Sequence, residues 1–263
     1  PKALAAKPAL LLVLHGSRGT GAAVRRQSAY EFDVYAEEQG YLVVYPDGFE
    51  NHWNGCRRSA GYSANTQGID DVGFLSALVQ QLTEQYDADP TRVVVTGFSN
   101  GGHMAYRLAL EAPELLHGIA PIAASLPVTD NLGCVLQGKA VSVAIFNGTE
   151  DPVNPYEGGL VSVSGDSTRG LVQSSQQTAA YWVQLAGLDQ PPVVIDHPER
   201  DNNLHSSVRE QRWDGAEQVS LFTLRGSGHV IPSYQARFPR ILGGEAGDVA
   251  AASVLAGTWL ARQ

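Results

Sequence analysis

The sequence is poor in cysteine and has no long apolar segment. Its 263 residues include two cysteines, Cys56 and Cys134, which are too few for a network of disulfides or for a cysteine-rich zinc site with four ligands. The longest apolar run near the start covers residues 9–14, whereas a membrane-spanning helix needs roughly 20 residues. We therefore expect neither a disulfide-stapled miniprotein nor a membrane protein.

Basic residues are also scarce. The chain has 18 Lys and Arg against 27 Asp and Glu, a net charge of -9, and no basic run, so we expect no nucleic-acid partner and no anionic membrane surface. With 43% hydrophobic residues the composition is typical of a soluble globular protein, and residues 1–263 are predicted to form a single domain without an obligate protein partner. A polar, glycine-rich stretch follows residue 14 where a signal-peptide cleavage site would lie, so the chain is expected to be cytoplasmic or already mature.

Apolar, β-branched runs alternate with segments of helical periodicity along the chain. Because the runs are apolar throughout, buried parallel strands are predicted, at residues 9–14, 42–45, 92–96, 119–124, 141–146 and 219–224. Helices are predicted at residues 70–82, 103–110 and 173–186, and from an N-cap at Asp248 to the C-terminus. This alternation predicts an α/β fold with a doubly wound, mostly parallel sheet and helices on both faces.

One serine lies between two glycines where a predicted strand meets a predicted helix, in RVVVTGFSNGGHMAYRLAL. The residues Gly97, Phe98, Ser99, Asn100 and Gly101 fit the pattern G-x-S-x-G, the nucleophile elbow, in which glycines leave room for a sharp turn that exposes the serine. The pattern is short and also arises by chance. The strand before it and the helix after it favour the catalytic interpretation, with Ser99 as the nucleophile.

A serine hydroxyl needs a base to take its proton and an acid to orient the base. On this fold the acid and then the histidine follow the serine, each after a later strand. His229 lies in a glycine-rich turn after the last predicted strand and is the predicted base, with His205 as the reserve. Asp151 follows the strand at 141–146 and is the predicted acid, with Glu150 as the alternative; Pro152 favours Asp151 because it restricts that residue to an extended backbone.

Two backbone amides are predicted to bind the negatively charged oxygen of the reaction intermediate. One is the amide of Asn100, at the start of the helix, and the other is the amide of Ser17, after the first strand, with Arg18 as its alternative. The glycines around Ser17 lack the spacing G-x-G-x-x-G, so a dinucleotide site is not expected, and no cofactor is predicted.

Three further histidines and two long loops have less specific predicted roles. His103 is expected to be structural, while His197 and His205 lack the spacing of metal ligands and are expected in solvated loops, so no metal site is predicted. The loops at 49–68 and 156–170 are long enough to be functional. They carry three aromatic residues that either stack on an aromatic acid or sugar ring or are half-buried packing, namely Trp53, Tyr62 and Tyr156.

An ordered set of motifs covers most of the chain: LLVLHGSRGTG, WNGC, GIDDVGFLSALVQQL, GFSNGGHMAYRLA, NGTEDPVNPY, TAAYW and GSGHVIP. In these motifs the sequence resembles the α/β-hydrolase esterases that group polyhydroxybutyrate depolymerases with feruloyl and acetylxylan esterases (LpqC-like, carbohydrate esterase family 1). The resemblance implies an α/β-hydrolase fold. It also implies catalytic roles for Ser99, Asp151 and His229 and an oxyanion hole at Ser17 and Asn100.

The same resemblance bears on the cysteines and on localisation. Members of the family are usually secreted and commonly have a disulfide near the site, which implies a Cys56–Cys134 bond and a secreted or periplasmic protein. Two free buried thiols are the alternative. The family's polymer-binding linker and extra domain are not recognisable in these 263 residues, which argues against a crystalline polyester as the substrate.

The expected activity is that of a serine carboxylesterase acting on a small-molecule, polysaccharide or polyester ester through an acyl-enzyme. Feruloyl or related plant cell-wall esters are the first choice of substrate. Poly(3-hydroxybutyrate) or short hydroxyalkanoate oligomers are the second and acetylxylan the third. The remaining alternatives are a peptidase of the prolyl-oligopeptidase kind and a binding protein that has kept the fold without catalysis.

Overall fold

An eight-stranded sheet forms the centre of the molecule in the computed structural model, which describes residues 1–163, 165–200 and 206–261. The strand order is β2-β1-β3-β4-β5-β10-β9-β8; pairs from β2 to β10 are parallel, and β9 and β8 add antiparallel pairs at one edge. The strands are β1 (Leu10–Leu14), β2 (Leu42–Val44), β3 (Val93–Phe98), β4 (Gly118–Ile122), β5 (Ser142–Gly148), β8 (Val193–Asp196), β9 (Ser207–Trp213) and β10 (Val219–Arg225). A separate small hairpin pairs β6 (Gly159–Leu160) with β7 (Leu171–Val172).

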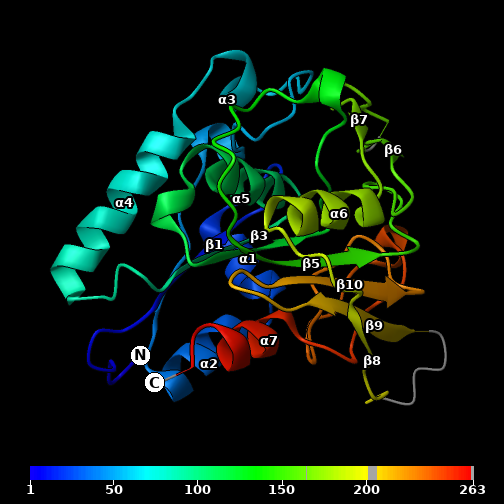
Figure 1. Ribbon diagram of the computed structural model, residues 1–263. Coiled ribbons are helices and arrows are strands. Elements are labelled where there is room, and N and C mark those ends of the chain that lie inside the picture. The colour runs from blue at the N-terminus through cyan, green and yellow to red at the C-terminus, as the bar shows by residue number, and fades with distance from the viewer. Residues whose placement is uncertain (164, 201–205, 262–263) are drawn as a thin grey trace.

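Helices cover both faces of the sheet (Figure 1). Figure 1 shows α4, α5 and α6 above the sheet and α1, α2 and α7 below it. The helices are α1 (Gly21–Gln27), α2 (Glu31–Gln39), α3 (Ser63–Thr66), α4 (Asp71–Tyr86), α5 (Asn100–Glu111), α6 (Ser175–Leu185) and α7 (Ala251–Thr258). Short 3₁₀ turns lie at η1 (Phe49–Asn51), η2 (Pro113–Leu115), η3 (Thr129–Asn131) and η4 (Arg240–Leu242). The prediction of a doubly wound, mostly parallel α/β sheet is confirmed.

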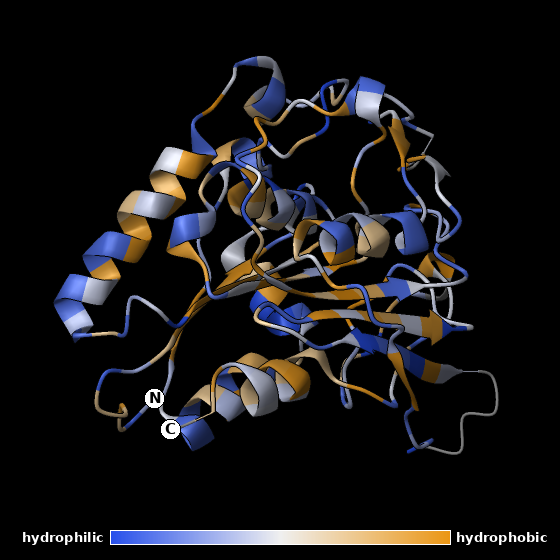
Figure 2. Cartoon of the chain, in the orientation of Figure 1, coloured by the Kyte–Doolittle hydropathy of each residue, from blue (hydrophilic) through white to orange (hydrophobic). Residues whose placement is uncertain are grey.

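The apolar strands divide their side chains between two hydrophobic cores, one on each face of the sheet. On β1, Leu11 and Val13 join the core that also includes α1, α2 and α7, while Leu10 and Leu12 join the core under α4, α5 and α6. Successive side chains of a strand point to opposite faces, so only a continuously apolar strand can supply both cores. Figure 2 shows this concentration of apolar residues along the central strands.

All six predicted strands and four predicted helices are present, with ends that differ by a few residues. The N-cap assigned to Asp248 is wrong: α7 begins at Ala251, and the Asp248 carboxylate instead accepts hydrogen bonds from the Arg200 amide and the Ser206 hydroxyl. No helix in the described ranges has the length and apolar character needed to cross a bilayer.

The segment around His197 also differs from expectation. His197 directly follows β8, is half-buried, and lies 3.0 Å from the Glu210 carboxylate, so it is not a solvated loop residue. His205, the reserve base, lies outside the described residues.

Candidate active site

Ser99 occupies a sharp turn between β3 and α5. Its backbone has φ 54° and ψ −112°, a combination rare outside glycine, and its amide donates to the Ile122 carbonyl at 2.8 Å. A Cβ atom on Gly97 would collide with the backbone of Gly101, and one on Gly101 would collide with the Leu14 carbonyl. Both positions therefore require glycine, because the backbone segments approach each other too closely for a side chain.

His229 and Asp151 form a buried pair at the same end of the sheet. His229 Nδ1 lies 2.7 Å from Asp151 Oδ2, and the two side chains are 7% and 1% exposed. The other carboxylate oxygen, Oδ1, accepts hydrogen bonds from the amides of Val153 and Asn154 at 2.7 and 2.8 Å. The carboxylate is thus fully bonded and held in place, and it fixes the orientation of the imidazole ring.

The alternatives for the acid and the base take other positions. Glu150 is exposed, and it is Asp151 that contacts His229. His103 is buried in α5, and burial, with the nearby charges of Arg57, His229 and Arg169, lowers its pKa well below the ordinary value. His103 is therefore neutral, and its Nδ1 has no hydrogen-bond partner within the described part of the chain.

Ser99 and His229 share the walls of a cavity of about 180 Å³. Ser99 Oγ makes no hydrogen bond to another described residue, and the bond from a catalytic serine to its base is often long before substrate binds. The lining combines backbone amides with apolar side chains and consists of Gly16, Ser17, Gly19, Gln27, Phe98, Ser99, Val153, Val163, His229 and Leu242.

The loop after β1 brings the Ser17 amide to the cavity. The amide of Arg18 donates to the Asn51 carbonyl at 2.8 Å, so Arg18 is already bonded, whereas the Ser17 amide has no acceptor among the described residues. Gly16 lies against Ser99: a Cβ on Gly16 would be 3.5 Å from the Ser99 Cβ. Asn100 is the first residue of α5, where backbone amides lack partners within the helix. Of the two candidates in this loop, Ser17 is therefore the one free to bind an anion with Asn100.

His15 holds this loop in place, a role that the sequence analysis missed. Its Nε2 accepts from the Gly48 amide at 2.9 Å, which leaves Nδ1 to donate to the Gly16 carbonyl at 2.8 Å. Burial is the largest cause lowering the His15 pKa, which favours this neutral form. The only available signal was its position immediately before Gly16 at the end of an apolar strand.

The three aromatic residues proposed to bind substrate are placed differently. Trp53 is fully buried, and its indole donates to the His15 carbonyl at 3.1 Å. Tyr156 is also buried and shares a 2.7 Å hydrogen bond with Thr223. Tyr62 is half-buried, and its ring stacks on that of His52 at 4.8 Å. Trp53 and Tyr156 thus have packing roles in this structure, and only the Tyr62 ring remains partly accessible.

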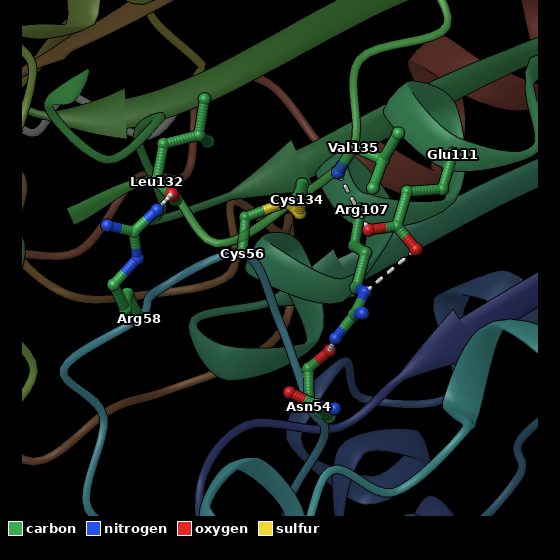
Figure 3. The surroundings of a disulfide bond; sticks show 8 residues. All are labelled: Asn54, Cys56, Arg58, Arg107, Glu111, Leu132, Cys134 and Val135. Atoms are coloured by element: carbon green, nitrogen blue, oxygen red, sulfur yellow. Dashed lines mark hydrogen bonds and ion pairs between the residues drawn. A yellow bond between two sulfur atoms is a disulfide. The ribbon is translucent and has the colours of Figure 1, made fainter. Parts of the chain in front are cut away.

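A disulfide joins Cys56 to Cys134, as predicted. Figure 3 shows how polar contacts fix the two loops on either side: Arg58 donates to the Leu132 carbonyl at 2.8 Å, and Arg107 donates to the Asn54 carbonyl at 2.9 Å. Trp53, which precedes Asn54, forms two hydrogen bonds with the Asn100 side chain: its amide donates to Asn100 Oδ1 at 2.8 Å, and its carbonyl accepts from Asn100 Nδ2 at 2.9 Å. The disulfide therefore anchors the loop that supports the residue next to Ser99.

Within the described ranges, no group of three or more His, Cys, Asp or Glu side chains is arranged so that it could hold a metal ion.

Comparison with known proteins shows that the chain is similar in sequence to esterases. Residues 59–164 match the model of the family described as phospholipase/carboxylesterase. The putative esterase NocK of Nocardia uniformis subsp. tsuyamanensis is 28% identical over 232 residues, 85% of this chain and 65% of the relative. Poly(3-hydroxyalkanoate) depolymerase C of Paucimonas lemoignei is 25% identical over 88% of this chain and 57% of the relative. The chain therefore spans somewhat less than two thirds of the length of these relatives.

A solved structure supports the fold. The acetyl xylan esterase from Aspergillus awamori superposes with a TM-score of 0.60 at 20% identity, covering 88% of this chain and 87% of that one. At this low sequence identity, the similarity shows a shared fold and nothing more. The expected α/β-hydrolase fold and the expected resemblance to esterases are confirmed: the chain has the fold of the α/β-hydrolases and is similar in sequence to carboxylic ester hydrolases.

Proposed function

We propose that the protein is a serine carboxylesterase in which Ser99 is the nucleophile, His229 the base and Asp151 the residue that orients the base. The observation that carries this proposal is the placing of Ser99, on its strained turn, in one cavity with a histidine whose Nδ1 is 2.7 Å from a buried carboxylate. Nucleophile, base and acid follow one another in the chain in the order usual for this fold.

In the first half of the reaction, His229 Nε2 takes the Ser99 proton as the serine oxygen attacks the ester carbonyl. The Asp151 carboxylate accepts a hydrogen bond from the N–H at Nδ1, so the proton of the neutral imidazole stays on Nδ1 and Nε2 is free to act as a base. The carbonyl oxygen becomes negatively charged and is bound by the amides of Ser17 and Asn100. His229 then gives the proton to the alcohol oxygen, the carbon–oxygen bond breaks, and an acyl-serine remains.

In the second half, water takes the place of the alcohol. His229 accepts a proton from the water molecule while its oxygen attacks the acyl carbonyl, and the same two amides stabilise the second oxyanion. Return of the proton to the Ser99 oxygen releases the carboxylic acid and restores the enzyme. No cofactor takes part in this cycle.

We propose that the substrate is an ester in which the acyl or alcohol group next to the scissile bond is small. Feruloyl and related cell-wall esters were the first expectation because three aromatic residues were available for stacking; with Trp53 and Tyr156 buried, Tyr62 alone supports that choice. Hydroxyalkanoate oligomers gain support from the similarity to a poly(3-hydroxyalkanoate) depolymerase along 88% of the chain. Acetylated xylan is the third substrate.

The disulfide supports an oxidising location. Disulfides persist in secreted and periplasmic proteins and are rare in the reducing cytosol. We therefore propose that the Cys56–Cys134 bond forms outside the cytoplasm, in a secreted or periplasmic protein.

Initial rates of hydrolysis test the proposal, with methyl ferulate, acetylated xylan, a hydroxybutyrate oligomer and a peptide amide as substrates. Ser99→Ala is expected to lower turnover of the preferred ester about 10⁶-fold, because a nucleophile and its base act as a unit. Ser76→Ala is the matched control, since the Ser76 hydroxyl donates to the Val72 carbonyl within α4. We expect that variant to keep the wild-type rate.

The pattern of rates separates the alternatives. A Ser99-dependent preference for one ester assigns the substrate class, and a preference for the peptide amide would indicate a peptidase. Absence of hydrolysis, together with no labelling of Ser99 by a serine-directed phosphonate, would overturn the esterase proposal in favour of a binding protein.

A further inference from the structure

Two arginines are buried near the proposed nucleophile. Arg57 directly follows the disulfide-bonded Cys56 and is 2% exposed, and Arg169 lies just before β7 and is 3% exposed. Arginine is rarely buried unless its charge is paired. We call Arg57, Arg169 and the buried His103 the arginine cluster.

The arginine cluster adjoins Ser99 through α5. The His103 amide donates to the Ser99 carbonyl at 3.0 Å, so the imidazole lies one helical turn beyond the nucleophile. Burial is the main cause that lowers the His103 pKa, and the charges of Arg57, His229 and Arg169 lower it further.

Tyr62 gives a second connection between the cluster and the site. Its hydroxyl accepts from the Asn100 side chain at 3.0 Å, and Arg57 Nη2 lies 3.5 Å from the same hydroxyl. Arg169 sits 6.0 Å from the centre of the Tyr62 ring. Both guanidinium groups therefore surround the residue that contacts Asn100, immediately next to Ser99.

The positive charge of the cluster is only partly balanced. Arg169 pairs with Asp166 at 2.6 Å, and hydrogen bonds from Thr168 and Arg169 lower the Asp166 pKa to about 2, so that carboxylate stays ionised. Within the described residues no carboxylate pairs with Arg57, whose 3.5 Å contact to the Tyr62 hydroxyl is its sole side-chain hydrogen bond. The Nε atoms of both arginines are buried without a partner.

Arg107 shows how a structural arginine is satisfied in the same protein. Its guanidinium pairs with Glu111 at 3.1 Å and donates to the Asn54 carbonyl at 2.9 Å (Figure 3). Arg57 is more deeply buried, yet its guanidinium has neither an acidic partner nor a backbone acceptor among the described residues. Burial of a guanidinium with so few acceptors is unfavourable, because the single long contact to Tyr62 replaces little of the hydration that the charge has lost. An anion bound beside it would supply what is missing.

The two arginine-bearing segments are held together rigidly. Asn131 Oδ1 accepts from the Ser59 amide at 3.1 Å, while its Nδ2 donates to the Arg169 carbonyl at 3.0 Å. Arg57 also pairs with Leu132 in an isolated antiparallel β-bridge, two residues before the disulfide-bonded Cys134. These links give the guanidinium groups a fixed backbone, which a binding site needs.

We propose that Arg57, together with Arg169, forms a subsite for a carboxylate of the substrate, so that the preferred esters carry a free carboxylate close to the scissile bond. A guanidinium matches a carboxylate through paired, charge-assisted hydrogen bonds. The chemical class is thus the half-esters of dicarboxylic acids and the short oligomers of hydroxy acids with a free acid end. This inference rests on the esterase function proposed above.

Two matched substrate pairs test the subsite. One is the linear dimer of 3-hydroxybutyrate with a free terminal carboxylate, compared with the same dimer capped as a terminal amide, which places the charge on the alcohol side. The other is monomethyl adipate compared with methyl hexanoate, which places it on the acyl side. Wild-type protein is expected to favour the anionic member of at least one pair by about 10- to 100-fold in kcat/KM, as a charge-assisted hydrogen bond predicts.

Three variants connect that preference to the cluster. Arg57→Met should bring the ratio of kcat/KM for the anionic and neutral substrates close to one. Arg57→Lys keeps the charge but not the paired N–H donors of the guanidinium, so it should retain part of the preference. Arg58→Met is the control, because Arg58 is exposed and, within the described ranges, its guanidinium donates to the Leu132 carbonyl alone. We expect that variant to keep both the rates and the ratio of the wild type.

The outcomes separate the subsite from the esterase function. Equal kcat/KM within both pairs, or an Arg57→Met protein that keeps the wild-type ratio, overturns the subsite while the esterase function stands. No hydrolysis of any of the four compounds by the wild type counts against the esterase function itself.

Discussion

The His229–Asp151 pair and the arginine cluster are both buried, but they differ in how their charges are satisfied. Each oxygen of Asp151 has a partner, two backbone amides on one and the imidazole on the other. In the cluster, both Nε atoms and His103 Nδ1 have none among the described residues. A saturated pair is preorganised for a step that repeats in every turnover, whereas an unsaturated one has bonding capacity left for a ligand.

Asp151→Asn breaks the saturated pair and should have the largest effect. The backbone amides of Val153 and Asn154 hold an oxygen at Oδ1, so the new NH₂ group faces His229 as a donor. Nδ1 must then accept, the proton moves to Nε2, and kcat is expected to fall about 10⁴-fold. Glu150→Gln, at the exposed neighbouring position, is the matched control and should keep the wild-type kcat. Steady-state rates on a neutral ester measure both. Similar losses in the two variants would contradict the assignment of the acid.

Removal of the disulfide affects the segment that carries Arg57 of the arginine cluster. The bond closes a loop of 78 residues, so Cys56→Ser combined with Cys134→Ser should lower the free energy of unfolding by about 4.5 kcal/mol through loop-closure entropy. Urea denaturation measures the loss, and wild-type protein treated with a thiol reductant should show the same midpoint as the double variant.

The same double variant sharpens the comparison. Arg57 is next to Cys56, while Asp151 and His229 lie outside the cross-linked segment. We therefore expect the anionic-to-neutral substrate ratio to fall further than the rate on a neutral ester. Equal losses in both would mean that the two regions depend on the disulfide alike.

His103 gives the smallest effect, and it depends on pH. Its pKa is well below the ordinary value of 6.5 in the folded protein, so below about pH 6.5 the unfolded chain binds a proton that the folded chain does not. The stability contributed by neutral His103 is present above that pH and is lost as the pH falls, by up to about 1.4 kcal/mol per pH unit.

Urea denaturation of the wild type and His103→Gln between pH 8 and pH 5 measures this contribution. The difference in unfolding free energy between the two should be constant above about pH 7 and should shift against the wild type below it. Parallel curves throughout the range would show that the imidazole titrates alike in the folded and unfolded chains.

Much of the fold could be predicted because its strands are apolar throughout and its turns contain glycine. Strand β9, SVREQRW, was not predicted, since an antiparallel strand at the edge of the sheet alternates polar and apolar residues and its apolar content is low. Helix α2 was missed as well: its N-cap is Tyr30, in a left-handed conformation and without a side-chain cap. The single-domain expectation stays a prediction.

The site divides in the same way. Ser99, Asp151 and His229 were identifiable because each follows a strand, and Ser17 because it follows the first. Arg57 was visible only as one of two adjacent arginines; that one is buried and the other exposed depends on contacts with Tyr62, Leu132 and the disulfide, which no local pattern encodes. Asp248 failed for a similar reason, since a distant segment uses its carboxylate.

The disulfide also divides the chain into a covalent ring, a free segment before it (residues 1–55) and a free tail after it (residues 135–263). Residues 56–134 form the ring, which holds Ser99 as well as Arg57 and His103, while Asp151, His229 and Arg169 belong to the tail. Fraying that begins in the tail would separate the base from the nucleophile and leave the ring closed. The protein would then lose its proton-transfer pair first and recover it by redocking the tail onto a ring that the disulfide has kept closed.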